Sequence, residues 1–263
     1  MVEEGMVLED YLYVHLDGIS NSILSKGLTH HDFHRYTLER PENLLLLDPY
    51  VSEGEYENHS GFRVIRGEEK IDHYFDSLVA NPKQRGIKWL DFKEYDVLKQ
   101  MTPNEIAELL YFGHMKSQLR SPFFYKLQNN YAFFDMGNHL TKIYYRYIEE
   151  FYQTLSQKLT QKVINQLNAN RSFFSKKLTH ISVLPVELVS QLKPSMQEGI
   201  VFNFSQVGLI DGQYIIPIHV IEDNLRKIEN GDFKKAETIG SLVYDENSAS
   251  WELHKEEFES LFI

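Results

Sequence analysis

The stretch from Ser121 to Asn168 reads SPFFYKLQNNYAFFDMGNHLTKIYYRYIEEFYQTLSQKLTQKVINQLN and carries the clearest pattern in the chain. Its first part holds two aromatic runs separated by Asn129-Asn130. Asparagine tolerates the positive φ that a two-residue primed turn requires, so the runs predict a β-hairpin. In that hairpin Tyr125 would lie opposite Phe134, and one face would be covered by a core.

The second part of the stretch has apolar residues at steps of three and four, which is typical of an amphipathic helix. These residues are Leu140, Ile143, Tyr144, Tyr147, Ile148, Phe151, Leu155, Leu159, Val163 and Leu167. A helix over residues 139–168 would be about 45 Å long. We expect it to lie across a sheet as the central core helix, with the alternative that it also forms the seam of a homodimer.

Outside this stretch, helical signals dominate residues 1–120. Apolar spacing predicts helices over 19–27 and 68–81, and two capping boxes, Thr29 to Asp32 and Thr102 to Glu105, begin two more. Residues 121–263 contain Asp211-Gly212, a strong hairpin signal that sets Leu209 against Tyr214.

These patterns predict an α+β fold. A helix-rich N-terminal part (residues 1–120) and a strand-rich C-terminal part would surround the long central helix, with the hairpin, helix and C-terminal strands in residues 121–263. The two parts could also form one compact domain.

The composition excludes several kinds of site. The chain of 263 residues has no cysteine, which excludes disulfides, thiolate zinc sites and cysteine nucleophiles. Its start is acidic, and it has no apolar run of about 18 residues, so we predict a cytoplasmic, soluble protein. A formal net charge of -11 disfavours a nucleic-acid partner for the chain as a whole.

The charge is unevenly distributed. Residues 112–180 carry 10 basic and 3 acidic side chains, whereas residues 1–111 carry 11 and 21, and residues 181–263 carry 6 and 14. Acidic flanks that cover a basic centre explain this pattern. The alternative is a face for nucleic acid or another polyanion, with Lys142, Arg146, Lys158 and Lys162 as candidate contacts.

One histidine cluster has the density of a metal site. His30, His31, Asp32 and His34 lie together, and His30 and His34 are one helical turn apart. These residues would serve a metal-dependent hydrolase, or they would form the solvated first turn of a helix.

No specific catalytic or nucleotide-binding motif accompanies these features. The sequence lacks His-Glu-x-x-His, Gly-x-Ser-x-Gly, a Walker loop and Gly-x-Gly-x-x-Gly. The leading hypothesis is therefore a cytoplasmic, non-enzymatic binding or regulatory protein of unknown ligand. Metal-dependent hydrolysis and polyanion binding are the two alternatives.

Overall fold

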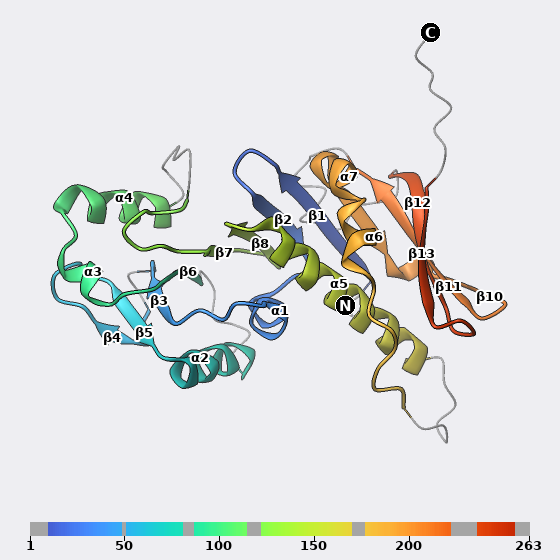
Figure 1. The fold of residues 1–263 in the computed structure, drawn as a ribbon, viewed down its shortest axis with the longest axis horizontal. Helices are drawn as coiled ribbons and strands as arrows, with labels where there is room; N and C mark the ends of the chain where they lie inside the picture. Colours follow the sequence, from blue (N-terminus) through green and yellow to red (C-terminus); the bar gives the residue numbers. More distant parts are fainter. Residues whose placement is uncertain are drawn as a thin grey trace, which may run out of the picture. The chain divides into compact units, whose positions relative to one another are not determined.

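The computed structural model describes residues 10–48, 51–80, 87–114, 122–169, 177–221 and 236–255. Figure 1 shows its elements in chain order. The strands are β1 (Tyr11–Asp17), β2 (Ser22–Lys26), β3 (Asn43–Leu46), β4 (Glu55–Tyr56), β5 (Arg63–Arg66), β6 (Lys88–Phe92), β7 (Tyr131–Gly137), β8 (Leu140–Tyr145), β9 (Ile200–Asn203), β10 (Gly208–Ile210), β11 (Gln213–Val220), β12 (Glu237–Asp245) and β13 (Ser250–Lys255). The helices are α1 (His30–Tyr36), α2 (Glu68–Ala80), α3 (Asp96–Lys99), α4 (Pro103–Gly113), α5 (Ile148–Ala169), α6 (Val186–Ser190) and α7 (Lys193–Glu198), with a 3-10 turn, η1 (Phe204–Gln206). Within the described residues, no helix is long and apolar enough to cross a membrane.

The prediction of a helix-rich N-terminal part is wrong. Strands β1 to β6 all precede residue 93, and strands of the described residues pair in antiparallel registers, as β3 does with β6 and β1 with β9. The segment 19–27, predicted as a helix, is instead a turn followed by β2, in which Ile23 is buried while Ile19 is 97% exposed. A short apolar run fits both periods, and here strand pairing overrides helical spacing.

The predicted hairpin around Asn129-Asn130 is also wrong. The hairpin of this region consists of β7 and β8, and its turn lies at Asn138 and His139, which both have positive φ. Tyr131 pairs with Tyr145, and Phe133 pairs with Ile143. The polypeptide before β7 forms turns rather than a strand.

The long helix is shorter than predicted because its expected first nine residues, 139–147, hold the end of that turn and β8. Helix α5 begins at Ile148 and has 22 residues. From there the predicted face is buried, including Phe151, Leu155, Leu159 and Val163. The apolar residues of β8 fit helical spacing by coincidence, since strand pairing with β7 buries Leu140, Thr141, Ile143 and Tyr145 instead.

The chain divides into two compact units, which are described separately. Unit 1 contains Met1–Leu16, Ser25–Gly27 and Tyr152–Ile263, and unit 2 contains Asp17–Leu24 and Leu28–Phe151. In unit 1, β11 pairs with β9, β10 and β12, and β9 also pairs with β1. The predicted hairpin at Asp211-Gly212 is confirmed with its register, because Leu209 pairs with Tyr214.

The sheet of unit 2 runs in the order β8-β7-β6-β3-β5-β4, and its central strands β6 and β3 are buried on both faces. On one face the ring of Phe33 in α1 lies 5.0 Å from both Trp89 and Tyr131, between ring centroids. On the other face Phe112 of α4 contacts Phe134 at 4.8 Å. Alternate residues of β7 therefore enter two different aromatic cores.

Both predicted capping boxes are confirmed in unit 2. Thr29 and Asp32 begin α1, and Thr102 and Glu105 begin α4 with Pro103 in its first turn. Each box satisfies backbone N–H groups that have no partner inside the helix.

Candidate functional site

The four residues of the histidine cluster lie on α1 but in different environments. The carboxylate of Asp32 accepts hydrogen bonds from the backbone N–H and the hydroxyl of Thr29, both at 2.9 Å. His34 Nε2 lies 3.1 Å from the carboxylate of Asp72, and its ring stacks on Phe75. The hydrogen bonds from Thr29 show that the carboxylate of Asp32 caps the start of α1.

The other two histidines of α1 differ in exposure. His31 is exposed, whereas Nε2 of His30 is buried and has no hydrogen-bond partner in the described part of the chain. Burial lowers the pKa of His30, which favours its neutral form. In the residues that the structure describes, no group of three or more His, Asp or Glu side chains could hold a metal ion. Metal binding by this cluster stays a prediction from the sequence.

The four candidate polyanion contacts are divided between the two units. Lys142 and Arg146 belong to unit 2, whereas Lys158 and Lys162 lie on the part of α5 that belongs to unit 1. The ammonium of Lys142 lies over the ring of Tyr144, and that of Lys162 lies over Phe204. Of the four, Arg146 lines a hollow in unit 2.

A hollow of about 510 Å³ in unit 2 collects polar and aromatic side chains, and we call it the Arg146 hollow. It is lined by Glu39, Lys93, Tyr125, Gln128, Asn130, Arg146 and Tyr147. Its volume lies in the range of small-molecule sites, roughly 300–1,000 Å³. Tyr125 and Tyr147 are 93% and 55% exposed, so their rings are available to a ligand.

The loop that carries Tyr125 and Gln128 is shaped by one buried side chain. The amide of Asn129 accepts a hydrogen bond from Phe124 N–H at 2.8 Å and donates to the carbonyls of Pro122 and Tyr131 at 3.1 and 3.2 Å. Gln128 has a φ of +50°, a conformation that non-glycine residues rarely adopt. The bonds of Asn129 offset this local strain.

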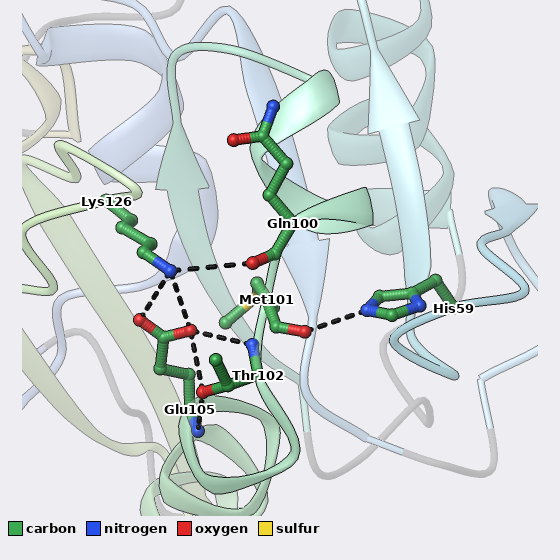
Figure 2. A network of polar contacts seen from close by, with 6 residues as sticks. All are labelled: His59, Gln100, Met101, Thr102, Glu105 and Lys126. Carbon is green, nitrogen blue, oxygen red and sulfur yellow. Dashed lines mark hydrogen bonds and ion pairs between the residues drawn. The ribbon is translucent and has the colours of Figure 1, made fainter.

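The same loop is tied to the start of α4. Figure 2 shows Lys126 reaching Glu105, whose carboxylate it contacts at 2.9 Å while that carboxylate also accepts from the backbone and hydroxyl of Thr102. The hydrogen bond from Lys126, together with those from Thr102, lowers the pKa of Glu105 to about 2. One carboxylate therefore caps a helix and anchors the loop of the hollow.

Arg146 is held in place from two sides. Its Nε donates to the carbonyl of Asn129 at 2.8 Å, and its guanidinium lies 4.9 Å from the ring centroid of Phe123. Its backbone N–H donates to the carbonyl of Asn130, also at 2.8 Å. The side chain is thus fixed before any ligand arrives, which lowers the entropy cost of binding.

Comparisons with known proteins assign this chain to no family. No family model, curated protein or solved structure matches this chain.

A buried polar network lies behind the wall of the Arg146 hollow. The hydroxyl of Tyr131 donates to the carboxylate of Glu150 and lies 3.0 Å from the carbonyl of Glu39, the residue whose side chain lines the hollow. The hydroxyl of Thr37 lies 3.1 Å from that of Tyr131 and 3.4 Å from the carboxylate of Glu150, and it can donate its single proton to one of them at a time. Burial, reinforced by nearby Glu39, raises the pKa of Glu150.

A second buried carboxylate supports the start of β7. Asp91, on β6, is 4% exposed and accepts hydrogen bonds from the backbone N–H groups of Asn130 and Tyr131 at 2.9 and 2.6 Å. Burial raises the pKa of Asp91 to about 7 in spite of these bonds. Carboxylates with shifted pKa values beside a cavity are a recognised mark of functional sites, although structural networks produce them as well.

Arg146 was predicted only as a polyanion contact, and none of the other lining residues was a predicted site residue. They come from the segment after α1, the residue after β6, the loop before β7 and the residue before α5. Only the fold brings these distant segments together. Asn129-Asn130, which predicted a hairpin turn, instead lies in the irregular loop before β7.

Proposed function

We propose that this chain is a cytoplasmic, non-enzymatic binding protein that holds a small ligand with an anionic group in the Arg146 hollow. The observation that carries this proposal is the charge in the hollow. Among the described residues, none of Glu39, Lys93 and Arg146 forms an ion pair within 4.0 Å, although all three line the same hollow. Charged side chains that line one hollow without an ion-pair partner favour a charged ligand.

The cationic groups have complementary roles in this proposal. Arg146 uses Nε for the Asn129 carbonyl, so the rest of its planar guanidinium can bind a carboxylate or phosphate group. Lys93 supplies a second positive charge on a flexible stem. Asn130 and Gln128 add amide groups that can orient the ligand.

The lining also supports binding rather than catalysis. Among the described residues that line the hollow there is no serine, threonine or histidine. The pairing of a serine or threonine nucleophile with a histidine base, common in covalent hydrolysis, therefore has no candidate there. The tyrosines and amides instead suit recognition of a ring and its substituents.

The test is a titration of three probes that each carry a ring and an anionic group: 3-phenylpropionate, adenosine monophosphate and L-phenylalanine. We expect isothermal titration calorimetry to detect at least one of them binding to the native chain. Arg146→Gln should weaken that binding by roughly 10- to 100-fold, because a charge-assisted hydrogen bond is lost.

Lys142→Gln is the matched control, since Lys142 lies four residues away in the same unit and outside the hollow. The Lys142→Gln variant should bind the probes with the same affinity as the native chain. Binding of none of the probes, or equal weakening by both substitutions, would contradict the proposal. Equal weakening would favour the polyanion alternative instead.

A further inference from the structure

The Arg146 hollow holds opposite charges that are both bonded to the segment Asn129-Asn130. The carboxylate of Glu39 accepts a hydrogen bond from the Asn130 side-chain amide at 3.2 Å. Arg146 bonds to the Asn130 carbonyl through its backbone and to the Asn129 carbonyl through its guanidinium. The two charged groups are therefore both fixed to the same short segment.

These charges are not neutralised by each other. In the part of the chain that the structure describes, Glu39 and Arg146 form no ion pair with each other or with any other side chain. A purely anionic ligand would satisfy Arg146 and Lys93 but would place its charge near the Glu39 carboxylate, at a cost in affinity. A ligand with one anionic and one cationic group satisfies both sides.

The remaining surface of the hollow is aromatic. Tyr125 and Tyr147, exposed as described above, both line it. Tyrosine rings bind flat rings by offset or edge contacts and expose a hydroxyl for a polar substituent. The loop under Tyr125 is fixed by Asn129 and by the contact of Lys126 with Glu105, so Tyr125 does not depend on a ligand to order its backbone.

We propose that the ligand of the Arg146 hollow belongs to the class of aromatic amino acids: a ring contacts the two tyrosines, a carboxylate binds Arg146 and Lys93, and an ammonium group binds Glu39. This assignment rests on the proposed function, because it names the ligand class of the same site. It adds two requirements, a cationic group and a ring, that the general proposal does not contain.

The experiment compares four compounds by calorimetry on the native chain. They are L-phenylalanine, 3-phenylpropionate, which lacks the amine, phenethylamine, which lacks the carboxylate, and L-leucine, which lacks the aromatic ring. We expect L-phenylalanine to bind most tightly, and removal of any one group should weaken binding by roughly tenfold or more. Glu39→Gln should remove the preference for L-phenylalanine over 3-phenylpropionate.

The outcomes separate the two levels of the proposal. If 3-phenylpropionate binds as tightly as L-phenylalanine, and Arg146→Gln weakens both, the amino-acid assignment is wrong while the anion-binding function stands. Equal binding of L-leucine and L-phenylalanine overturns the aromatic requirement. Failure of every compound, including adenosine monophosphate, to bind in an Arg146-dependent way overturns both proposals.

The Glu39→Gln variant is not expected to be destabilised. Glu39 is exposed, so Glu39→Gln should unfold at the same temperature as the native chain. The comparison of the four compounds needs no variant and decides the ligand class even if that variant is unstable.

Discussion

Single buried carboxylates and amides determine the local structure around the hollow. Asp91 satisfies two backbone N–H groups at the point where the irregular loop enters β7, and Asn129 satisfies three backbone groups of the loop itself. A buried N–H without a partner costs about 1–3 kcal/mol, so each side chain stabilises a backbone path that strand or helix bonding does not.

Asp91 should make stability depend on pH. Its pKa is raised from 3.8 to about 7 by burial, so the folded chain holds a proton that the unfolded chain has lost between those values. This contribution is fully present below pH 3.8 and is lost as the pH rises through about 7. The free energy of unfolding should fall by roughly 2–3 kcal/mol between pH 5 and pH 8 because of Asp91.

Urea unfolding at the two pH values tests this, with Asp91→Asn as the comparison. The variant should lose most of that decrease. The slope that remains combines the raised pKa of Glu150 with the lowered pKa values of His30 and His34, which act in opposite directions. An unchanged slope in the variant would mean that Asp91 is already ionised in the folded chain at pH 5.

At the scale of elements, local signals predicted turns and caps better than they predicted the period of short apolar runs. Capping boxes need only a few adjacent residues, and both were confirmed. So was the hairpin at Asp211-Gly212, where Gly212 has a φ of +83°. These caps and this turn could be predicted because the residues that form each of them are neighbours in the sequence.

The segments 19–27 and 139–147 could not be assigned in the same way. Their apolar residues satisfy both a helical and an extended period, and the decision comes from partners elsewhere in the chain. For β8 that partner is β7, and β7 in turn pairs with β6. The Arg146 hollow could not be predicted from the sequence either, because its seven lining residues come together only when the chain has folded.

The turn between β7 and β8 leads to a prediction at this scale. Asn138 and His139 have φ values of +52° and +61°, and an Asn-Gly sequence is the preferred one for such a primed turn. His139→Gly should therefore raise the free energy of unfolding by roughly 0.5 kcal/mol, since the relief of strain slightly exceeds the entropy cost of glycine.

The reciprocal control is Gly212→Ala in the other primed turn. An alanine Cβ there would lie 2.8 Å from the side-chain amide of Asn247, at a φ that alanine rarely adopts, so this variant should lose about 1 kcal/mol. Thermal unfolding of both variants checks the pair. A lower melting temperature for His139→Gly would contradict the assignment of strain to this turn.

At the scale of the whole molecule, the two units are assembled from the chain in different ways. Unit 2 consists of one long segment, Leu28–Phe151, and the short segment Asp17–Leu24 that precedes it. Unit 1 joins distant parts of the chain, and in it Tyr11 of β1 pairs with Asn203 of β9. Contacts between distant residues form slowly, because closing a long loop costs conformational entropy.

We therefore expect unit 2 to fold first. In pulsed hydrogen exchange during refolding, peptides that cover β6, β7 and β8 should gain protection before peptides that cover β1 and β9. Mass spectrometry of the quenched samples measures this order. Simultaneous or earlier protection of β1 and β9 would show that chain separation does not limit the folding of unit 1.

The anchoring of the hollow's loop by Asn129 also has a consequence for how ligand preference could change over evolution. The conformation of the loop is fixed by the Asn129 amide and by the Lys126 contact with Glu105. The exposed side chains of Tyr125 and Gln128 therefore contribute little to it. Mutations at these two positions could therefore alter what is recognised at little cost to the fold. Related chains would be expected to diversify there while retaining asparagine at the position of Asn129.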